Sequence, residues 1–143
     1  PATIKRMLTE HLKTKAALSV LTAIVPDARG YGRIVKDKKG NVVKIVEELD
    51  ATESEKQIDE INAGIYCAPV PFLFEILKKV ENKNSKNEYY LTDIVQLVSR
   101  QGDIVHACLV EDYQEVMGVN TPDELRRAAQ YLQAQGGLRL KGA

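Results

Sequence analysis

Short apolar segments alternate along the chain with segments of helical periodicity, and this alternation constrains the fold more than any other feature. Three segments have the length and composition of buried strands: residues 16–25 (AALSVLTAIV), 61–68 (INAGIYCA) and 103–110 (DIVHACLV). Residues 33–37 and 42–48 flank the turn residues Gly40 and Asn41, which is typical of a β-hairpin. None of these segments reaches the length of about 20 apolar residues that a membrane span needs.

Helical spacing of apolar residues indicates four helices: residues 2–13, a segment that begins at Pro69, residues 92–101, and a segment that begins at Thr121. One face of the first helix carries Ile4, Met7, Leu8 and Leu12. Thr92 is expected to be the N-cap of the third helix, and Thr121 with Glu124 predicts a capping box for the fourth, which is expected to end at Gly136–Gly137. A T-x-x-E pattern at Thr52 predicts a short helix over 52–59. Strands interleaved with helices predict an α/β fold, with a mixed, mostly parallel sheet flanked by helices and the hairpin as an antiparallel excursion.

The composition is globular and excludes several classes of function. The 143 residues match the usual length of one domain. The 20 basic and 20 acidic side chains balance, which argues against nucleic-acid binding as the main role, because neutralising phosphates needs a local excess of Lys and Arg. Two cysteines and two histidines make a structural zinc site improbable, so Cys67 and Cys108 are expected to be free thiols of a cytoplasmic protein.

The sequence contains no phosphate-binding glycine loop, so the candidate functional residues are polar groups at strand ends, where ligands of open α/β sheets bind. In GYGRI, Gly30 and Gly32 either serve a turn with positive φ or bring a backbone amide close to a ligand. Glu47 and Glu48 either protect an exposed edge strand or accept hydrogen bonds from ligand hydroxyl groups. Asn62 either satisfies backbone groups at a strand start or binds a sugar hydroxyl or acetamido group, since its amide both donates and accepts.

Two further segments allow the same two interpretations. Tyr89 and Tyr90 stand just before Thr92 and Asp93, and the two rings either pack half-buried or line a ligand site. Asn120 stands immediately before the fourth helix and is either a turn residue or a ligand contact.

Taken in order, five of these strings resemble one family. They are GYGRI at 30–34, VEE-x-DAT at 46–52, EIN-x-GIY at 60–66, EYYLTDIV at 88–95 and GVNT at 118–121. The family is the uridylyltransferase domain of bacterial bifunctional N-acetylglucosamine-1-phosphate uridylyltransferase/glucosamine-1-phosphate acetyltransferase. Each string is weak alone, but their order and spacing over residues 17–132 are specific. The resemblance implies part of the Rossmann-like fold of nucleotide-diphospho-sugar transferases.

The resemblance implies that four segments bind the sugar part of UDP-N-acetylglucosamine. Gly32 would offer its backbone to the ligand, Glu47 would bind sugar hydroxyls and Asn62 would contact the sugar. Tyr90 and Thr92 would line the sugar pocket, with Thr92 near the acetamido or phosphate end.

The resemblance also implies a reaction and a metal. The phosphate of N-acetylglucosamine 1-phosphate would attack the α-phosphorus of UTP, giving UDP-N-acetylglucosamine for cell-wall precursor synthesis. Asn120 would be one of two protein ligands to a catalytic Mg²⁺. No catalytic residue is identified in this part of the family pattern.

The chain also departs from the family pattern. It lacks the glycine-rich signature with its phosphate-gripping Arg and Lys, the metal-binding Asp of a GD-x-PL motif, and the hexapeptide repeats of the acetyltransferase domain. Residues 1–143 are therefore expected to be the sugar-acceptor half of a nucleotidyltransferase domain, inactive alone, from a protein that is a homotrimer when intact. Two alternatives stay open: another sugar-1-phosphate nucleotidyltransferase, or a non-catalytic sugar-binding or assembly module.

Overall fold

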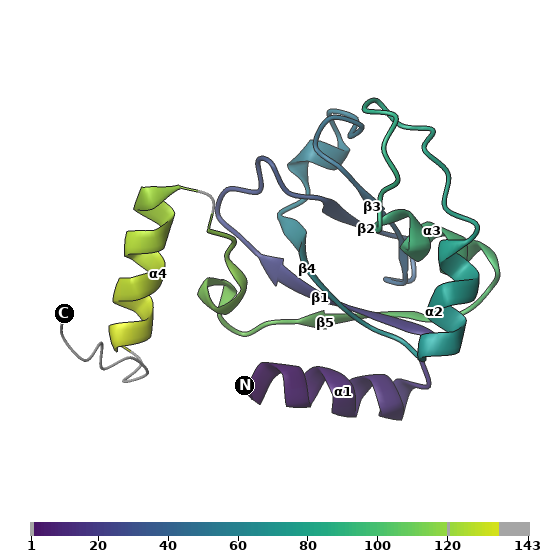
Figure 1. Cartoon of the computed structure of the whole chain (residues 1–143), viewed down its shortest axis with the longest axis horizontal. Helices are drawn as coiled ribbons and strands as arrows, with labels where there is room; N and C mark the ends of the chain where they lie inside the picture. Colours follow the sequence, from purple (N-terminus) through teal and green to yellow (C-terminus); the bar gives the residue numbers. More distant parts are fainter. Residues whose placement is uncertain (1, 120, 135–143) are drawn as a thin grey trace. The chain divides into compact units, whose positions relative to one another are not determined.

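The computed structural model describes residues 2–119 and 121–134, which belong to two compact units, Pro1–Glu111 and Asp112–Ala143. The elements of the first unit are α1 (Ala2–Thr14), β1 (Leu18–Ile24), β2 (Arg33–Lys36), β3 (Val42–Val46), the 3₁₀ turn η1 (Glu55–Gln57), β4 (Glu60–Cys67), α2 (Val70–Leu77), α3 (Asp93–Arg100) and β5 (Val105–Leu109). Those of the second are the 3₁₀ turn η2 (Tyr113–Val116) and α4 (Pro122–Ala134). Figure 1 shows the course of the chain. The expected strands and the four main helices are confirmed with small shifts at their ends, but the short helix expected over 52–59 is only the 3₁₀ turn η1.

The sheet of the first unit is mixed and has the strand order β3-β2-β4-β1-β5. β5 runs parallel to β1, whereas β4 runs antiparallel to both β1 and β2, and β2 runs antiparallel to β3. The mixed α/β sheet is therefore confirmed, but its parallel share is smaller than expected. The reason is that the hairpin joins the sheet through β4, and apolar periodicity reports the burial of a strand but not the direction in which it pairs.

The apolar core lies between α2, α3 and one face of the sheet. Leu18 and Val20 of β1 point into it, and Ile94, Val95 and Val98 of α3 are fully buried against them. Because side chains alternate along a strand, Ser19, which stands between Leu18 and Val20, points to the other face of the sheet.

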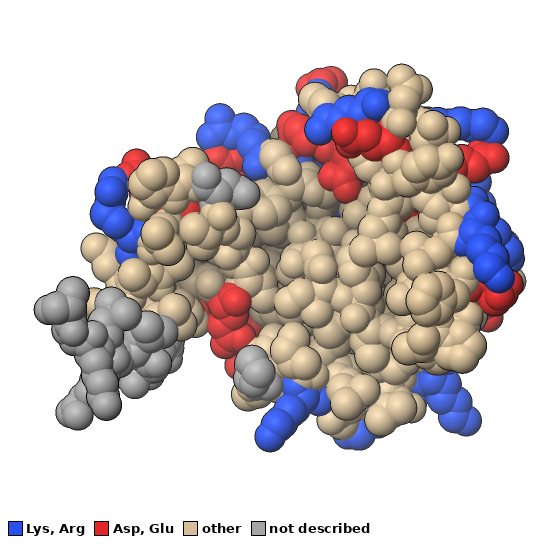
Figure 2. Space-filling model, in the orientation of Figure 1, with Lys and Arg blue, Asp and Glu red and all other residues tan. Residues whose placement is uncertain are grey.

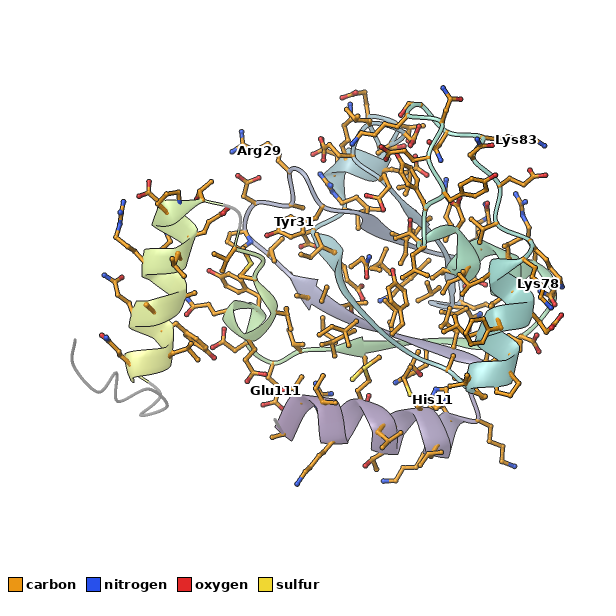
Figure 3. All side chains as sticks on the ribbon, viewed as in Figure 1. His11, Arg29, Tyr31, Lys78, Lys83 and Glu111 are labelled. Carbon is orange, nitrogen blue, oxygen red and sulfur yellow. The ribbon has the colours of Figure 1, made fainter. Side chains whose placement is uncertain are left out.

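The other face of the sheet is covered by α1 and is more polar. Nδ1 of His11 lies 2.8 Å from Oγ of Ser19, and both side chains are buried. Figure 3 labels His11 on α1. Nε2 of His106 lies 3.0 Å from Oε2 of Glu10, so a second histidine joins α1 to β5. Hydrogen bonds set how α1 is rotated on the sheet.

Only one of the four residues expected on the apolar face of the first helix, Met7, is buried. Ile4, Leu8 and Leu12 are 40%, 51% and 69% exposed, while Met7 and His11 are the buried residues of α1. The polar contacts of the helix with the sheet favour this rotation over burial of the apolar stripe.

β4 contains a bulge. Val20 of β1 pairs with Tyr66, and Thr22 pairs with Asn62, so the stretch of β4 between these pairs holds more residues than the stretch of β1 opposite it. Gly64 lies within this bulge at φ +74°, a left-handed conformation that glycine adopts without steric cost.

The edge of β4 that faces away from β1 is largely open. Among the described residues it pairs with β2 only where Arg33 meets Ile61. Ile65 of β4 and Phe74 of α2 are 37% and 60% exposed. Figure 2 shows uncharged side chains over β4 and α2, with charged ones at the margin. The part of β4 beyond Ile61 thus has no strand partner on this side among the described residues.

The second unit confirms the expected capping box. The backbone N–H of Thr121 donates to Oε2 of Glu124 at 2.8 Å, and the N–H of Glu124 donates to Oγ1 of Thr121 at 3.2 Å. The expected helix end at Gly136–Gly137 lies outside the described residues.

Both cysteines of the first unit are free thiols, as expected. In the part of the chain that the structure describes, no helix has the length and apolar character to cross a membrane.

Candidate functional site

A pocket of about 220 Å³ lies in the first unit where β3 ends and α3 begins. Its walls come from β3 and the residues just after it, from the loop that follows α2, and from the residues that lead into α3. Three of the predicted site residues line it: Glu47, Tyr90 and Thr92. We refer to it as the β3–α3 pocket.

Thr92 joins the two sides of this pocket. Its hydroxyl donates to Oε1 of Glu47 at 2.9 Å. Thr92 does stand at the N-cap position of α3, but its side chain makes no capping hydrogen bond. The expected side-chain cap is therefore wrong, because Thr92 is itself in a helical conformation and the first N–H groups of α3 donate to backbone carbonyls of the preceding turn.

Gly32 is needed for a close approach. A Cβ atom at this position would lie 2.8 Å from Cγ2 of Ile45 and 3.4 Å from Oε1 of Glu47. Its partner in GYGRI, Gly30, has φ +83° and serves the turn. The turn interpretation is therefore confirmed for Gly30, whereas the role of Gly32 toward a ligand stays a prediction.

An ion pair fastens the GYGRI loop to the end of β3. Nη2 of Arg33 lies 2.7 Å from Oε2 of Glu48, and the Arg33 side chain is only 1% exposed. The same oxygen of Glu48 accepts from the N–H of Gly30 at 3.1 Å, and Nη1 of Arg33 donates to the carbonyl of Tyr31. The Arg33 guanidinium and the Gly30 N–H lower the pKa of Glu48. Figure 3 labels Tyr31 in this loop. Glu48 therefore holds the loop while its neighbour Glu47 faces the pocket.

Asn62 is linked to the same group through its backbone and is anchored through its side chain. Its N–H donates to the carbonyl of Gly32 at 2.9 Å. Its Oδ1 accepts from the N–H of Gly64 at 2.9 Å, and its Nδ2 donates to the hydroxyl of Tyr66 at 2.9 Å.

Carboxylates dominate the electrostatics of the β3–α3 pocket. Burial raises the pKa of Asp93, and the nearby carboxylates of Asp50 and Glu47 raise it further. Desolvation also raises the pKa of the Tyr90 phenol, with Asp50 and Glu88 as the next causes. The Tyr90 phenol therefore keeps its proton and can donate to a ligand oxygen, while the carboxylates can accept.

The two lysines at the pocket are paired with carboxylates outside its lining. Nζ of Lys44 lies 2.6 Å from Oε1 of Glu55, and Nζ of Lys83 lies 2.9 Å from Oε2 of Glu81. Figure 3 labels Lys83 in the loop after α2. The pocket therefore combines carboxylate acceptors with hydroxyl donors, a set of groups suited to a neutral polyol.

The structure thus brings five of the six predicted site residues together: Gly32, Glu47, Asn62, Tyr90 and Thr92. The sixth, Asn120, lies outside the described residues. In residues 2–119 and 121–134, no group of three or more His, Cys, Asp or Glu side chains could hold a metal ion. Sequence reasoning missed the anchoring roles of Arg33 and Tyr66. For Tyr66 the available signal is a glycine inside a strand pattern, which is typical of a bulge.

A larger cavity of about 490 Å³ lies within the second unit, between η2 and α4. Its lining includes Met117, Arg127 and Tyr131, and none of the five described site residues. The smaller pocket is therefore the candidate site, because three of the predicted residues, Glu47, Tyr90 and Thr92, line it.

Comparisons with known proteins give matches over most of the chain. Residues 2–135 match the family model described as nucleotidyl transferase. The protein named bifunctional protein GlmU from Caldicellulosiruptor saccharolyticus is 48% identical over 130 residues, which are 91% of this chain and 28% of the relative. Proteins of the same name from Bacillus licheniformis and Geobacter sulfurreducens are 43% and 46% identical over 91% and 90% of this chain, and 28% and 27% of their own lengths. The chain spans a little over a quarter of the length of these curated relatives.

Proposed function

The chain belongs to the nucleotidyl transferase family, and from this premise we propose that the intact protein transfers a uridylyl group from UTP to N-acetylglucosamine 1-phosphate. A phosphate oxygen of the sugar phosphate attacks the α-phosphorus of UTP, the bond to pyrophosphate breaks, and UDP-N-acetylglucosamine forms for cell-wall precursor synthesis in the cytoplasm. Residues 1–143 form the sugar-acceptor half of the transferase domain.

The hydrogen bond from Thr92 to Glu47 carries this proposal. It holds a carboxylate at the wall of the β3–α3 pocket, beside Gly32, where no Cβ fits. A carboxylate offers about four acceptor positions, so one bond from Thr92 leaves capacity for ligand hydroxyl groups. Asn62 adds an amide that both donates and accepts. This chain's residues therefore bind and orient the sugar, and the nucleotide half of the site comes from elsewhere in the intact protein.

Mg²⁺ is the proposed cofactor and, when bound, neutralises charge on the phosphates. Asn120 is the proposed ligand in this chain. The described residues supply no complete metal site, which is compatible with the family pattern because Mg²⁺ takes only one or two protein oxygens in phosphate-binding sites. The second protein ligand and the trimeric assembly belong to the intact protein.

The test is steady-state kinetics of the intact protein with Glu47→Ala and Asn62→Ala. Both substitutions are expected to raise KM for N-acetylglucosamine 1-phosphate by roughly tenfold or more, because each removes hydrogen bonds to the sugar. KM for UTP is expected to change little. The exposed Glu53→Ala variant is the control for loss of a carboxylate.

An equal loss for both substrates would overturn the assignment of these residues to the sugar. A preference for glucose 1-phosphate over the N-acetylated sugar would favour another sugar-1-phosphate nucleotidyltransferase. Uridylyl transfer by residues 1–143 alone would overturn the half-site proposal.

A further inference from the structure

The contact between Asn62 and Tyr66 depends on the bulge in β4. Residues four apart on a regular strand have Cα atoms about 13 Å apart. Nδ2 of Asn62 nevertheless reaches the Tyr66 hydroxyl at 2.9 Å. The left-handed Gly64 shortens the strand between them. The bulge therefore brings a tyrosine hydroxyl back onto a residue of the candidate site.

These contacts also fix which way the Asn62 amide points. A backbone N–H can only donate, so the bond from Gly64 at 2.9 Å assigns Oδ1 to that side. Nδ2 must then face Tyr66, and the tyrosine hydroxyl accepts. One N–H and one oxygen lone pair of Asn62 remain for a ligand.

We propose that Tyr66 is a positioning residue that, together with the Gly64 bulge, holds the Asn62 amide in the orientation that reads the sugar of an N-acetylated hexose 1-phosphate. This inference rests on the proposed function, since Asn62 is taken as a sugar contact. The family resemblance gives Tyr66 no role of its own, although the residue is part of the EIN-x-GIY string. Tyr66 acts through Asn62.

The state of the Tyr66 hydroxyl fits this role. Burial raises its pKa to about 12, and the nearby Glu47 carboxylate also raises it. The hydroxyl therefore stays protonated throughout the physiological range. Because the hydroxyl accepts from Asn62, its own proton can still be donated to a ligand.

The first test needs no ligand. Tyr66→Phe removes only the hydroxyl, and NMR follows hydrogen exchange of the Gly64 amide in the 143-residue chain. Loss of one anchor of Asn62 is expected to speed this exchange roughly three- to tenfold, because a factor of that size corresponds to the net free energy of one hydrogen bond. Tyr113→Phe, in the second unit, is the matched control and is expected to leave it unchanged. Unchanged exchange in Tyr66→Phe would overturn the positioning role.

The second test measures selectivity. N-acetylglucosamine 1-phosphate and glucose 1-phosphate are titrated separately into both variants and the unaltered chain. Tyr66→Phe is expected to lower the ratio of the two affinities by roughly three- to tenfold, because a misaligned Asn62 loses the acetamido contact. A merely structural loss would weaken both ligands equally, and that result would overturn the proposal.

The two tests distinguish the positioning role of Tyr66 from the proposed sugar site. Faster Gly64 exchange without sugar-phosphate binding by the unaltered chain would support the anchoring of Asn62 and count against the proposed sugar site. Binding of N-acetylglucosamine 1-phosphate with no effect of Tyr66→Phe would support the sugar site and reject the role of Tyr66.

Discussion

The hydroxyl of Thr92 donates to Oε1 of Glu47 at 2.9 Å, across 45 residues of sequence. This bond joins the end of β3 to the start of α3 and therefore connects two walls of the pocket. Since Thr92 is buried, its hydroxyl would lose a partner without gaining water if Glu47 moved away.

Thr92→Val should separate the hydrogen bond from the shape of the side chain. Valine matches threonine in shape but cannot donate, so the free energy of unfolding is expected to fall by about 1–2 kcal/mol. Urea denaturation measures this loss. Thr92→Ser keeps the hydroxyl and should retain most of the stability; equal losses in both variants would mean that the methyl group matters more than the bond.

Gly32→Ala should destabilise the chain by about 1–3 kcal/mol, because the new Cβ would lie 2.8 Å from Cγ2 of Ile45. A double-mutant cycle with Ile45→Ala checks the cause, since removing Cγ2 makes room for the methyl group. The two substitutions should be less damaging together than the sum of the single losses. Strict additivity would show that the cost at Gly32 has another origin.

Glu48→Gln should lower the free energy of unfolding by about 2 kcal/mol or more, since it leaves the buried Arg33 guanidinium without its countercharge. Glu48 is itself 30% exposed, which keeps the loss below that of a fully buried pair. Glu53→Gln, in an exposed pair with Lys56, is the control and should change stability by less than about 0.5 kcal/mol. Guanidinium denaturation of both variants compares the pairs, and similar losses would argue against a structural role for Arg33–Glu48.

Acid should weaken the contact between α1 and β5. The hydrogen bond with His106 is the main reason why the pKa of Glu10 falls from 4.5 to about 2. A folded-state pKa below the unfolded value gives stability that is present above about pH 4.5 and is lost as the pH falls towards 2. Urea midpoints should therefore drop less steeply over this range in Glu10→Gln than in the unaltered chain. Glu75→Gln, whose side chain is 68% exposed, should keep the original slope.

The fold could be predicted as far as local patterns determine it. The apolar segments became β1, β4 and β5, and the capping box at Thr121 formed because both of its bonds lie within one helical turn. Strand direction and the rotation of α1 depend on partners far along the chain. Glu10 of α1, for example, contacts His106, which lies 96 residues further along the chain, and helical periodicity does not register such a contact.

In the candidate site too, sequence patterns identify residues but do not reveal contacts between distant parts of the chain. Family strings identified the five residues that the structure brings together, but not how they are held. Thr92 stands where a local rule predicts an N-cap, yet its own backbone is helical, so its side-chain oxygen accepts from no N–H of α3 and its hydroxyl donates to Glu47. The bond between Asn62 and Tyr66 exists only because of a bulge, which strand periodicity does not reveal.

The sparse packing of α1 has a consequence for how the chain comes apart. Only Met7 and His11 of this helix are buried, and Lys15, which links it to β1, has φ +52°. Such a helix can detach as a unit ahead of the rest of the fold, because few of its own side chains are buried. Limited digestion with trypsin should therefore cut first at Lys13 or Lys15 and leave a resistant core that begins near Ala16.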